Sequence, residues 1–256
     1  MIVAIVAIVH NYDLLPYYLQ HYRRLGVQRF IISCDPGRLD PSDGLRRALS
    51  AQSDIEVVDL PGGFRRSNLV GMINEEVRSR SVTAGDWVIP ADLDELNQYP
   101  APLDDLVEQM LQSGSTYVAG RLRDRLAAGG LLTELAPFEE GLTIWAQYPL
   151  EADVTARIAE GQTEKVLLFR GDLPLSVGHH RLRDGTLSKA FEARGVAHHF
   201  KWRAGLDRVL AWRIENEVRA KVPWSRESTE LTKYIKEHGR IVPKDVDAVA
   251  GWNGLD

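Results

Sequence analysis

The N-terminal run of this chain constrains its fold more than any other stretch. Residues 2–9 read Ile-Val-Ala-Ile-Val-Ala-Ile-Val, without one polar side chain. β-Branched residues favour strands, and a strand with no polar positions is covered on both faces, as in parallel sheets flanked by helices. The run has no basic residues before it and is too short to span a bilayer. We therefore expect a buried central strand and not a signal peptide.

Helical and strand patterns alternate after this run. Apolar residues at helical spacing follow Asp13, a candidate N-cap, and Gly26 ends that predicted helix. Three further strands and two further helices are expected: strands 30–34, 55–58 and 87–89, with helices 45–52 and around 69–77. Such alternation predicts a doubly wound α/β sheet with right-handed crossovers. Ligands bind such sheets at the carboxyl ends of the strands.

Length and charge limit the classes of function. The chain has 256 residues and a net charge of −5, which gives no general attraction to nucleic acid or to an anionic membrane. We expect a single domain over 1–256, with a nucleotide-sugar-binding half (1–120), an acceptor-side half (121–204) and a helical C-terminal segment (205–256). The single cysteine, Cys34, excludes an intrachain disulfide. No segment approaches 18 consecutive apolar residues, so we predict a cytoplasmic protein whose membrane contact is at most peripheral.

Three carboxylates, Asp92, Asp94 and Glu95, follow the predicted strand at 87–89. Clustered anions repel one another, so such a group persists where a cation or several hydrogen-bond donors neutralise it. Carboxylate oxygens suit Mg²⁺ or Mn²⁺, held by one or two carboxylates together with substrate phosphates. The plainer alternative is that Asp92 or Asp94 caps the helix that starts near Pro102, or faces water.

The second half of the chain is less regular. Residues 127–164 have weak periodicity, and we interpret them as a long acceptor-side loop. Two histidine pairs follow, His179-His180 and His198-His199. Because side chains alternate along a strand, at most one member of each pair points at a given site. Each pair fits a polar core or loop position as well as a functional one. The C-terminal stretch predicts two amphipathic helices.

The order of these motifs resembles bacterial glycosyltransferases of the GT-A type, in the broad family-two-like group. The similar features are a first strand ending at Asn11, the pattern Leu-x-x-Tyr-Leu-x-His-Tyr-x-x-Leu-Gly (15–26), a strand ending at Asp35, and Asp-Trp-Val ahead of Asp-x-Asp-Glu (86–95). Later parts match less tightly: Lys165 opening a strand, a Gly-His-His turn (178–180) and His-aromatic-Lys (199–201).

The resemblance implies a UDP-, GDP- or dTDP-sugar donor and a saccharide or other hydroxyl acceptor, with inversion favoured. It places Asp35 on the base or ribose and Asp92 on the ribose, and it adds Asn11 and Lys165 as further donor-binding candidates. Lys201 is a donor-binding candidate on separate grounds, because its position would let it approach phosphates. Asp92 and Asp94 would hold Mn²⁺ or Mg²⁺, with His199 as a further ligand. The leaving nucleoside diphosphate explains the metal, because a divalent ion stabilises the charge that develops on it.

The sequence also departs from the family pattern. Tyr12 separates Asn11 from Asp13, and the Glu-Asp motif that often supplies the base is missing. Asp124 is our candidate for the base, with Glu164 in reserve, although an Arg-Asp salt bridge would explain Asp124 equally.

Two alternatives to glycosyl transfer remain. One is a sugar-phosphate nucleotidyltransferase, which would need a glycine-rich basic loop after the first strand. Residues 10–16 contain no glycine, lysine or arginine, and this counts against that alternative. The other is a catalytically inactive carbohydrate-binding or scaffold protein on the same fold.

Overall fold

The computed structural model describes residues 1–8, 12–34, 42–59, 76–138, 143–176, 179–183, 187–219 and 225–252. Asn11 and Asp35 lie outside these described residues, so their predicted roles are not tested. The chain divides into two units, which are described separately. Unit 1 comprises Met1–Arg121 and Glu164–Ala197, and unit 2 comprises Leu122–Thr163 and His198–Asp256. The prediction of one domain over the whole chain stays a prediction.

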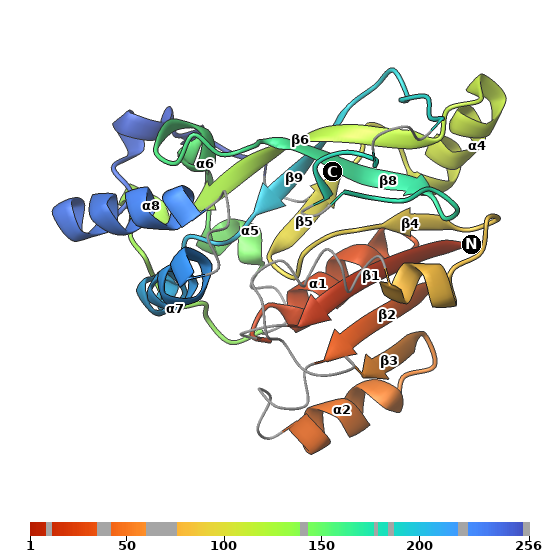
Figure 1. Cartoon of the computed structure of the whole chain (residues 1–256), viewed down its shortest axis with the longest axis horizontal. Coiled ribbons are helices and arrows are strands. Elements are labelled where there is room, and N and C mark those ends of the chain that lie inside the picture. The colour runs from red at the N-terminus through yellow and green to blue at the C-terminus, as the bar shows by residue number, and fades with distance from the viewer. Residues whose placement is uncertain are drawn as a thin grey trace. The chain divides into compact units, whose positions relative to one another are not determined.

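Unit 1 is built on four parallel strands in the order β3-β2-β1-β4 (Figure 1). Their bounds are β1 Ile2–Ile8, β2 Arg29–Cys34, β3 Ile55–Asp59 and β4 Trp87–Ile89. Helix α1 (Leu15–Arg24) connects β1 to β2, and α2 (Ser42–Ser50) connects β2 to β3. The chain first adds strands on one side of β1 and then returns to add β4 on the other. The strand order therefore reverses between β1 and β4, which is where doubly wound sheets bind ligands.

Antiparallel strands complete the sheet of unit 1. Strand β8 (Glu164–Arg170) pairs with β4, and β6 (Tyr117–Leu126) pairs with β8. The short strand β5 (Glu95–Gln98) pairs with β9 (Gly195–His199), and α4 spans Leu103–Ser113. The α/β sheet expected from the sequence is thus confirmed, and it contains both parallel and antiparallel strands.

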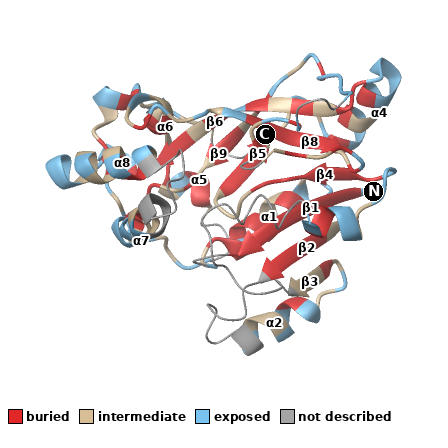
Figure 2. Ribbon diagram, viewed as in Figure 1, coloured by how far each residue is buried: buried red, intermediate tan, exposed pale blue. Residues whose placement is uncertain are grey.

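Strand β1 lies at the centre of the core of unit 1. All seven of its residues are buried, as the red ribbon in Figure 2 shows. Its Val3 and Ile5 side chains pack with Val88 of β4 and Phe169 of β8. Burial of each such side chain contributes roughly 1.5–3 kcal/mol. The unbroken apolar run is therefore explained by burial of both faces of the strand.

Unit 2 contains the C-terminal end of β6, paired with β7 (Leu150–Ala152), which in turn pairs with β10 (Val249–Ala250). Two four-residue helices, α5 (Ile144–Gln147) and α6 (Val154–Arg157), lie where the sequence predicted a long loop. The expectation of a loop without secondary structure was wrong, because helices of about one turn are too short to produce a helical period in the sequence. The acceptor-side role of these residues stays a prediction. Helices α7 (Leu206–Arg219) and α8 (Ser225–His238) confirm the helical C-terminal segment, and Leu206, Leu210 and Leu231 pack around Trp202.

Two expected helix caps are not found. Leu14, and not Asp13, is the N-cap of α1, and Pro102 is the N-cap of α4, without a capping side chain in either case. Asp92 and Asp94 are therefore not helix caps. In the part of the chain that is described, no helix is long and apolar enough to cross a membrane.

Candidate functional site

An acidic turn lies at the carboxyl end of β4, beside the point where the strand order reverses. Strand β4 pairs with β1 through Val3 and Val88, among others, and it ends at Ile89. Residues 92–95, Asp-Leu-Asp-Glu, then form a turn that closes with a 2.9 Å hydrogen bond from the Glu95 amide to the Asp92 carbonyl. We call these four residues the acidic turn. Its position is that of a ligand site in a doubly wound sheet.

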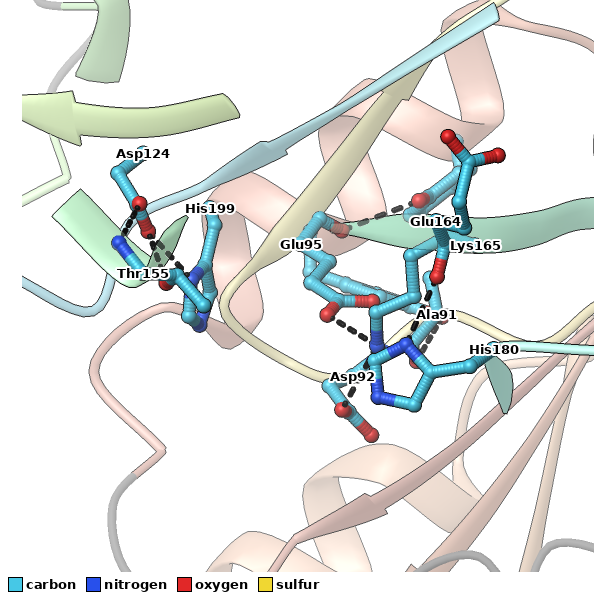
Figure 3. A network of polar contacts seen from close by, with 11 residues as sticks. Ala91, Asp92, Glu95, Asp124, Thr155, Glu164, Lys165, His180 and His199 are labelled. Atoms are coloured by element: carbon cyan, nitrogen blue, oxygen red, sulfur yellow. Dashed lines mark hydrogen bonds and ion pairs between the residues drawn. The ribbon is translucent and has the colours of Figure 1, made fainter. Parts of the chain in front are cut away.

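Lys165 supplies the cation that the acidic turn needs. This residue follows the first position of β8, and Figure 3 shows its side chain directed into the turn. Its Nζ lies 2.6 Å from Glu95 Oε1 and 3.7 Å from Asp92 Oδ2. The Lys165 and Glu95 side chains are 6% and 5% exposed, whereas that of Asp92 is 33% exposed. Glu95 is thus a buried partner of the lysine, whereas the Asp92 side chain is partly accessible to solvent.

The charges of the turn keep Lys165 protonated. Burial lowers the pKa of the Lys165 ammonium, but Glu95, Asp92 and Asp94 raise it by more, so the pKa lies above its usual value. Three carboxylates against one ammonium leave about two negative charges, an amount that one divalent cation would balance.

The residues of the turn fit a metal ion in part. Asp92 Oδ1 is buried and accepts no hydrogen bond from any described residue, so it is an oxygen that lacks a partner. Within the described ranges, no group of three or more His, Cys, Asp or Glu side chains is arranged to hold a metal. An ion at Asp92 and Asp94 would therefore complete its coordination with water or ligand phosphates, the usual arrangement for Mg²⁺.

His179 lies against the same turn and was not assigned a role from the sequence. It is 1% exposed, has a φ of 58° and forms a hydrogen bond to the Pro90 carbonyl. Burial lowers its pKa to about 4, with Lys165 and His180 adding to the shift and Asp92 opposing it. His179 is therefore neutral near pH 7. A left-handed backbone at a residue other than glycine is typical of functional sites, where surrounding structure holds it in place.

The two histidine pairs divide between separate environments. His180 Nδ1 lies 2.7 Å from the Glu164 carbonyl oxygen (Figure 3), whereas His179 forms a hydrogen bond to the Pro90 carbonyl. His198 is fully buried and stacks on Trp252, at 5.3 Å between ring centroids. His199 points elsewhere, to Asp124. His198 and His199, which lie next to each other on β9, thus contact different partners, as the alternation of side chains along a strand predicts.

Asp124 and His199 form a hydrogen-bonded pair in unit 2. Asp124 is 1% exposed, and its Oδ1 lies 3.0 Å from His199 Nδ1 (Figure 3). Its two oxygens also accept hydrogen bonds from the Thr155 amide, at 2.7 Å, and hydroxyl, at 3.0 Å. The neighbouring Arg123 and Arg125 pair with other carboxylates, Asp153 and Glu151. Asp124 therefore does not form the salt bridge with a neighbouring arginine that was the alternative to a catalytic role.

The other candidates have partners of their own. Glu164 is 61% exposed and forms an ion pair with Arg194. Lys201 is 9% exposed and lies 3.0 Å from Glu227, whose pKa it lowers. Roles for these residues in catalysis or phosphate binding stay predictions.

Comparison with known proteins identifies similar structures but no family. No family model and no curated protein sequence matches the chain. The similar solved structures include HddC from Yersinia pseudotuberculosis complexed with GMP-PN, at 10% identity and a TM-score of 0.37, over 77% of this chain and 92% of that one. The 4-diphosphocytidyl-2C-methyl-D-erythritol synthase of Anaerococcus prevotii matches at 12% identity and a TM-score of 0.32, over 67% and 70%.

A third similar structure is UDP-glucose pyrophosphorylase from Acinetobacter baumanii, at 11% identity and a TM-score of 0.31, over 55% of this chain and 64% of that one. TM-scores this low do not establish a common fold. The fold described above therefore rests on the strand order of this chain.

Proposed function

We propose that this chain is a metal-dependent glycosyltransferase of the GT-A type, which moves a sugar from a nucleotide-sugar donor to a hydroxyl acceptor. The observation that carries the proposal is the acidic turn, directly after β4 where the strand order reverses, with the buried Lys165 ammonium inside it. The sequence resemblance supports the same reading, because the Asp-x-Asp-Glu motif forms this turn.

Asp92 and Asp94 would hold a Mn²⁺ or Mg²⁺ ion, and the buried Asp92 Oδ1, which has no hydrogen-bond partner among the described residues, supports that role. When bound, the ion would stabilise negative charge on a nucleoside diphosphate leaving group. Lys165 would add a fixed positive charge beside the phosphates, and Glu95 would hold Lys165 in place. The resemblance also suggests Asn11 and Asp35 on the base or ribose and His199 as a metal ligand. Lys201 near phosphate and Asp124 or Glu164 as the base are proposed from the residues themselves.

A sugar-phosphate nucleotidyltransferase is the second candidate. The names of two similar structures, a diphosphocytidyl-methylerythritol synthase and a UDP-glucose pyrophosphorylase, point to that chemistry more than to glycosyl transfer. The same acidic turn would serve either reaction, because a metal ion held there would bind the phosphates of a nucleotide sugar or those of a nucleoside triphosphate. Residues 10–16 weigh against this candidate because they contain no glycine, lysine or arginine with which to cradle a triphosphate. A catalytically inactive carbohydrate-binding or scaffold protein is the third candidate.

A thermal-shift panel tests the donor site. UDP, GDP, dTDP and CMP are each added with and without Mn²⁺ to the wild type and to Asp94→Asn. A nucleotide at about one hundred times its Kd adds roughly 2.7 kcal/mol of stability, which is a visible shift in melting temperature. We expect one nucleoside diphosphate to give a shift that needs Mn²⁺ and that Asp94→Asn abolishes. No shift with any nucleotide would reject the donor site.

Product analysis then separates the two enzymes. A glycosyltransferase releases a nucleoside diphosphate from a nucleotide sugar, at a slow rate even when water is the acceptor. A nucleotidyltransferase instead releases pyrophosphate from a nucleoside triphosphate and a sugar phosphate. Pyrophosphate release would favour the second candidate. Nucleotide binding with neither product would favour the third.

A further inference from the structure

Three side chains of α1 reach the segment that forms the acidic turn. The Tyr22 hydroxyl donates to the Glu95 carbonyl at 3.0 Å and accepts from the Asn97 amide at 3.1 Å. His21 Nε2 lies 2.9 Å from the Asn97 carbonyl oxygen. The Tyr18 hydroxyl lies 3.5 Å from the Ala91 carbonyl oxygen. All three belong to the Tyr-Leu-x-His-Tyr part of the sequence pattern at 15–26.

These contacts replace a missing neighbour strand. Strand β5 begins at Glu95, the last residue of the acidic turn, and in the described sheet it pairs only with β9. Its other edge would leave buried backbone groups without partners, which costs about 1–3 kcal/mol for each group. Tyr22 and His21 bind the Glu95 carbonyl and both backbone groups of Asn97. Side chains of α1 thus form the hydrogen bonds to this edge of β5 that a neighbouring strand normally forms.

The network continues to the strand that carries Lys165. Asn97 Nδ2 donates to the Tyr99 hydroxyl at 3.2 Å, and that hydroxyl donates to the Leu167 carbonyl at 2.9 Å. Leu167 lies two residues after Lys165 on β8. One chain of hydrogen bonds therefore connects α1 to both backbone segments that meet in the Lys165 and Glu95 ion pair.

We propose that Tyr22 and His21 are positioning residues that fix the backbone of the acidic turn, and so the spacing of its carboxylates from Lys165. The identity of the ligand at the acidic turn rests on the proposed function, whereas the positioning of the turn does not. Both side chains are neutral near pH 7, because burial raises the pKa of the Tyr22 hydroxyl and lowers the pKa of His21 to about 4.

The variant Tyr22→Phe tests the proposal, because it removes the bridging hydroxyl and keeps the buried ring. Its matched control is Tyr234→Phe in unit 2, where the hydroxyl also bridges two groups, donating to Asp245 at 2.8 Å and accepting from the Val242 amide at 3.3 Å. Amide hydrogen exchange is followed in the peptide 87–98, in peptides elsewhere in the chain, and in the peptide 240–246.

We expect Tyr22→Phe to accelerate exchange in 87–98 by about tenfold and to leave other peptides unchanged. The control should accelerate exchange in 240–246 alone. A change spread over the whole chain in Tyr22→Phe would show general destabilisation and overturn the positioning role, as would an unchanged 87–98 peptide.

Titration of Mn²⁺ with the nucleotide found by the thermal-shift panel adds a functional readout. We expect Tyr22→Phe to weaken this binding about tenfold, whereas the control binds as the wild type does. His21→Gln, which retains a donor to the Asn97 carbonyl, should bind more tightly than His21→Ala. If the wild type binds no nucleotide, the proposed function fails, and the exchange comparison still decides the positioning role.

Discussion

The Lys165 ammonium lies 2.6 Å from the Glu95 carboxylate, and both side chains are almost wholly buried. Two charges in a protein interior persist only as partners, because each alone would carry a desolvation cost of several kcal/mol. The pair also joins two parts of unit 1 that are distant in sequence, the start of β5 and the start of β8. The acidic turn therefore depends on a residue seventy positions away.

Removing the lysine should cost more than removing an exposed cation. Lys165→Met leaves Glu95 buried without its partner, and we expect a loss of about 3–5 kcal/mol in the free energy of unfolding. Arg170→Met is the control on the same strand, because Arg170 pairs with Asp172 at 40% and 39% exposure and should cost at most about 1 kcal/mol. Urea denaturation measures both values. The double variant Lys165→Met/Glu95→Gln should recover part of the lost stability. Equal losses in the free energy of unfolding for Lys165→Met and Arg170→Met would contradict the prediction.

Acid should destabilise the protein partly through His179. The folded protein keeps this imidazole neutral down to a pKa of about 4, whereas in the unfolded chain the imidazole binds a proton near the ordinary histidine pKa of 6.5. Between these values the unfolded state binds more protons, so stability falls as pH falls, by up to about 1.4 kcal/mol per pH unit for this group. Urea unfolding at pH 7.5 and pH 5 measures the slope. His179→Gln should lose less stability than the wild type over this interval, and identical slopes would reject the assignment.

The backbone at His179 should favour glycine over alanine. Its φ of 58° lies in the left-handed region, which costs a residue with a Cβ about 1–2 kcal/mol. Both His179→Gly and His179→Ala lose the imidazole and its hydrogen bond to Pro90, so their difference isolates the backbone effect. We expect the glycine variant to be the more stable of the two by about 1 kcal/mol in thermal or urea unfolding. An alanine variant of equal stability would show that the turn relaxes without cost.

Gly171 should not tolerate a side chain. A Cβ at this position, just after β8, would lie 2.4 Å from the Thr83 carbonyl oxygen, so the backbone before β4 would have to move. We expect Gly171→Ala to destabilise the protein by about 1–3 kcal/mol. Gly85→Ala is the matched control in the facing turn, because the nearest atom to its Cβ would be 3.9 Å away. Melting temperatures should fall for the first variant and stay nearly constant for the second.

The parallel strands were predictable because their signal is local. β1 and β4 are short apolar runs bounded by polar residues, and burial on both faces leaves that pattern in the sequence. β5 was not predicted, since its sequence Glu-Leu-Asn-Gln is polar and its hydrogen-bond partners come from α1 and β9. Its strand conformation is set by tertiary structure.

The candidate site was predictable in its acidic half only. The three carboxylates are adjacent in sequence, and their repulsion alone predicts a cation. That the cation includes Lys165, that His179 lies near Asp92, and that Asp124 pairs with Thr155 and His199 all depend on long-range packing. The motif around His21 and Tyr22 was visible as a resemblance, but its contacts with β5 could be seen only in the structure.

The buried Lys165 ammonium has a consequence for chemical labelling. Acylating reagents attack only the neutral amine, and this nitrogen is both protonated and shielded by Glu95, so it should react far more slowly than exposed lysines. Its modification would need the β4–β5 turn to swing away from β8. The rate at which mass spectrometry finds residue 165 acylated would therefore measure how often this part of unit 1 opens.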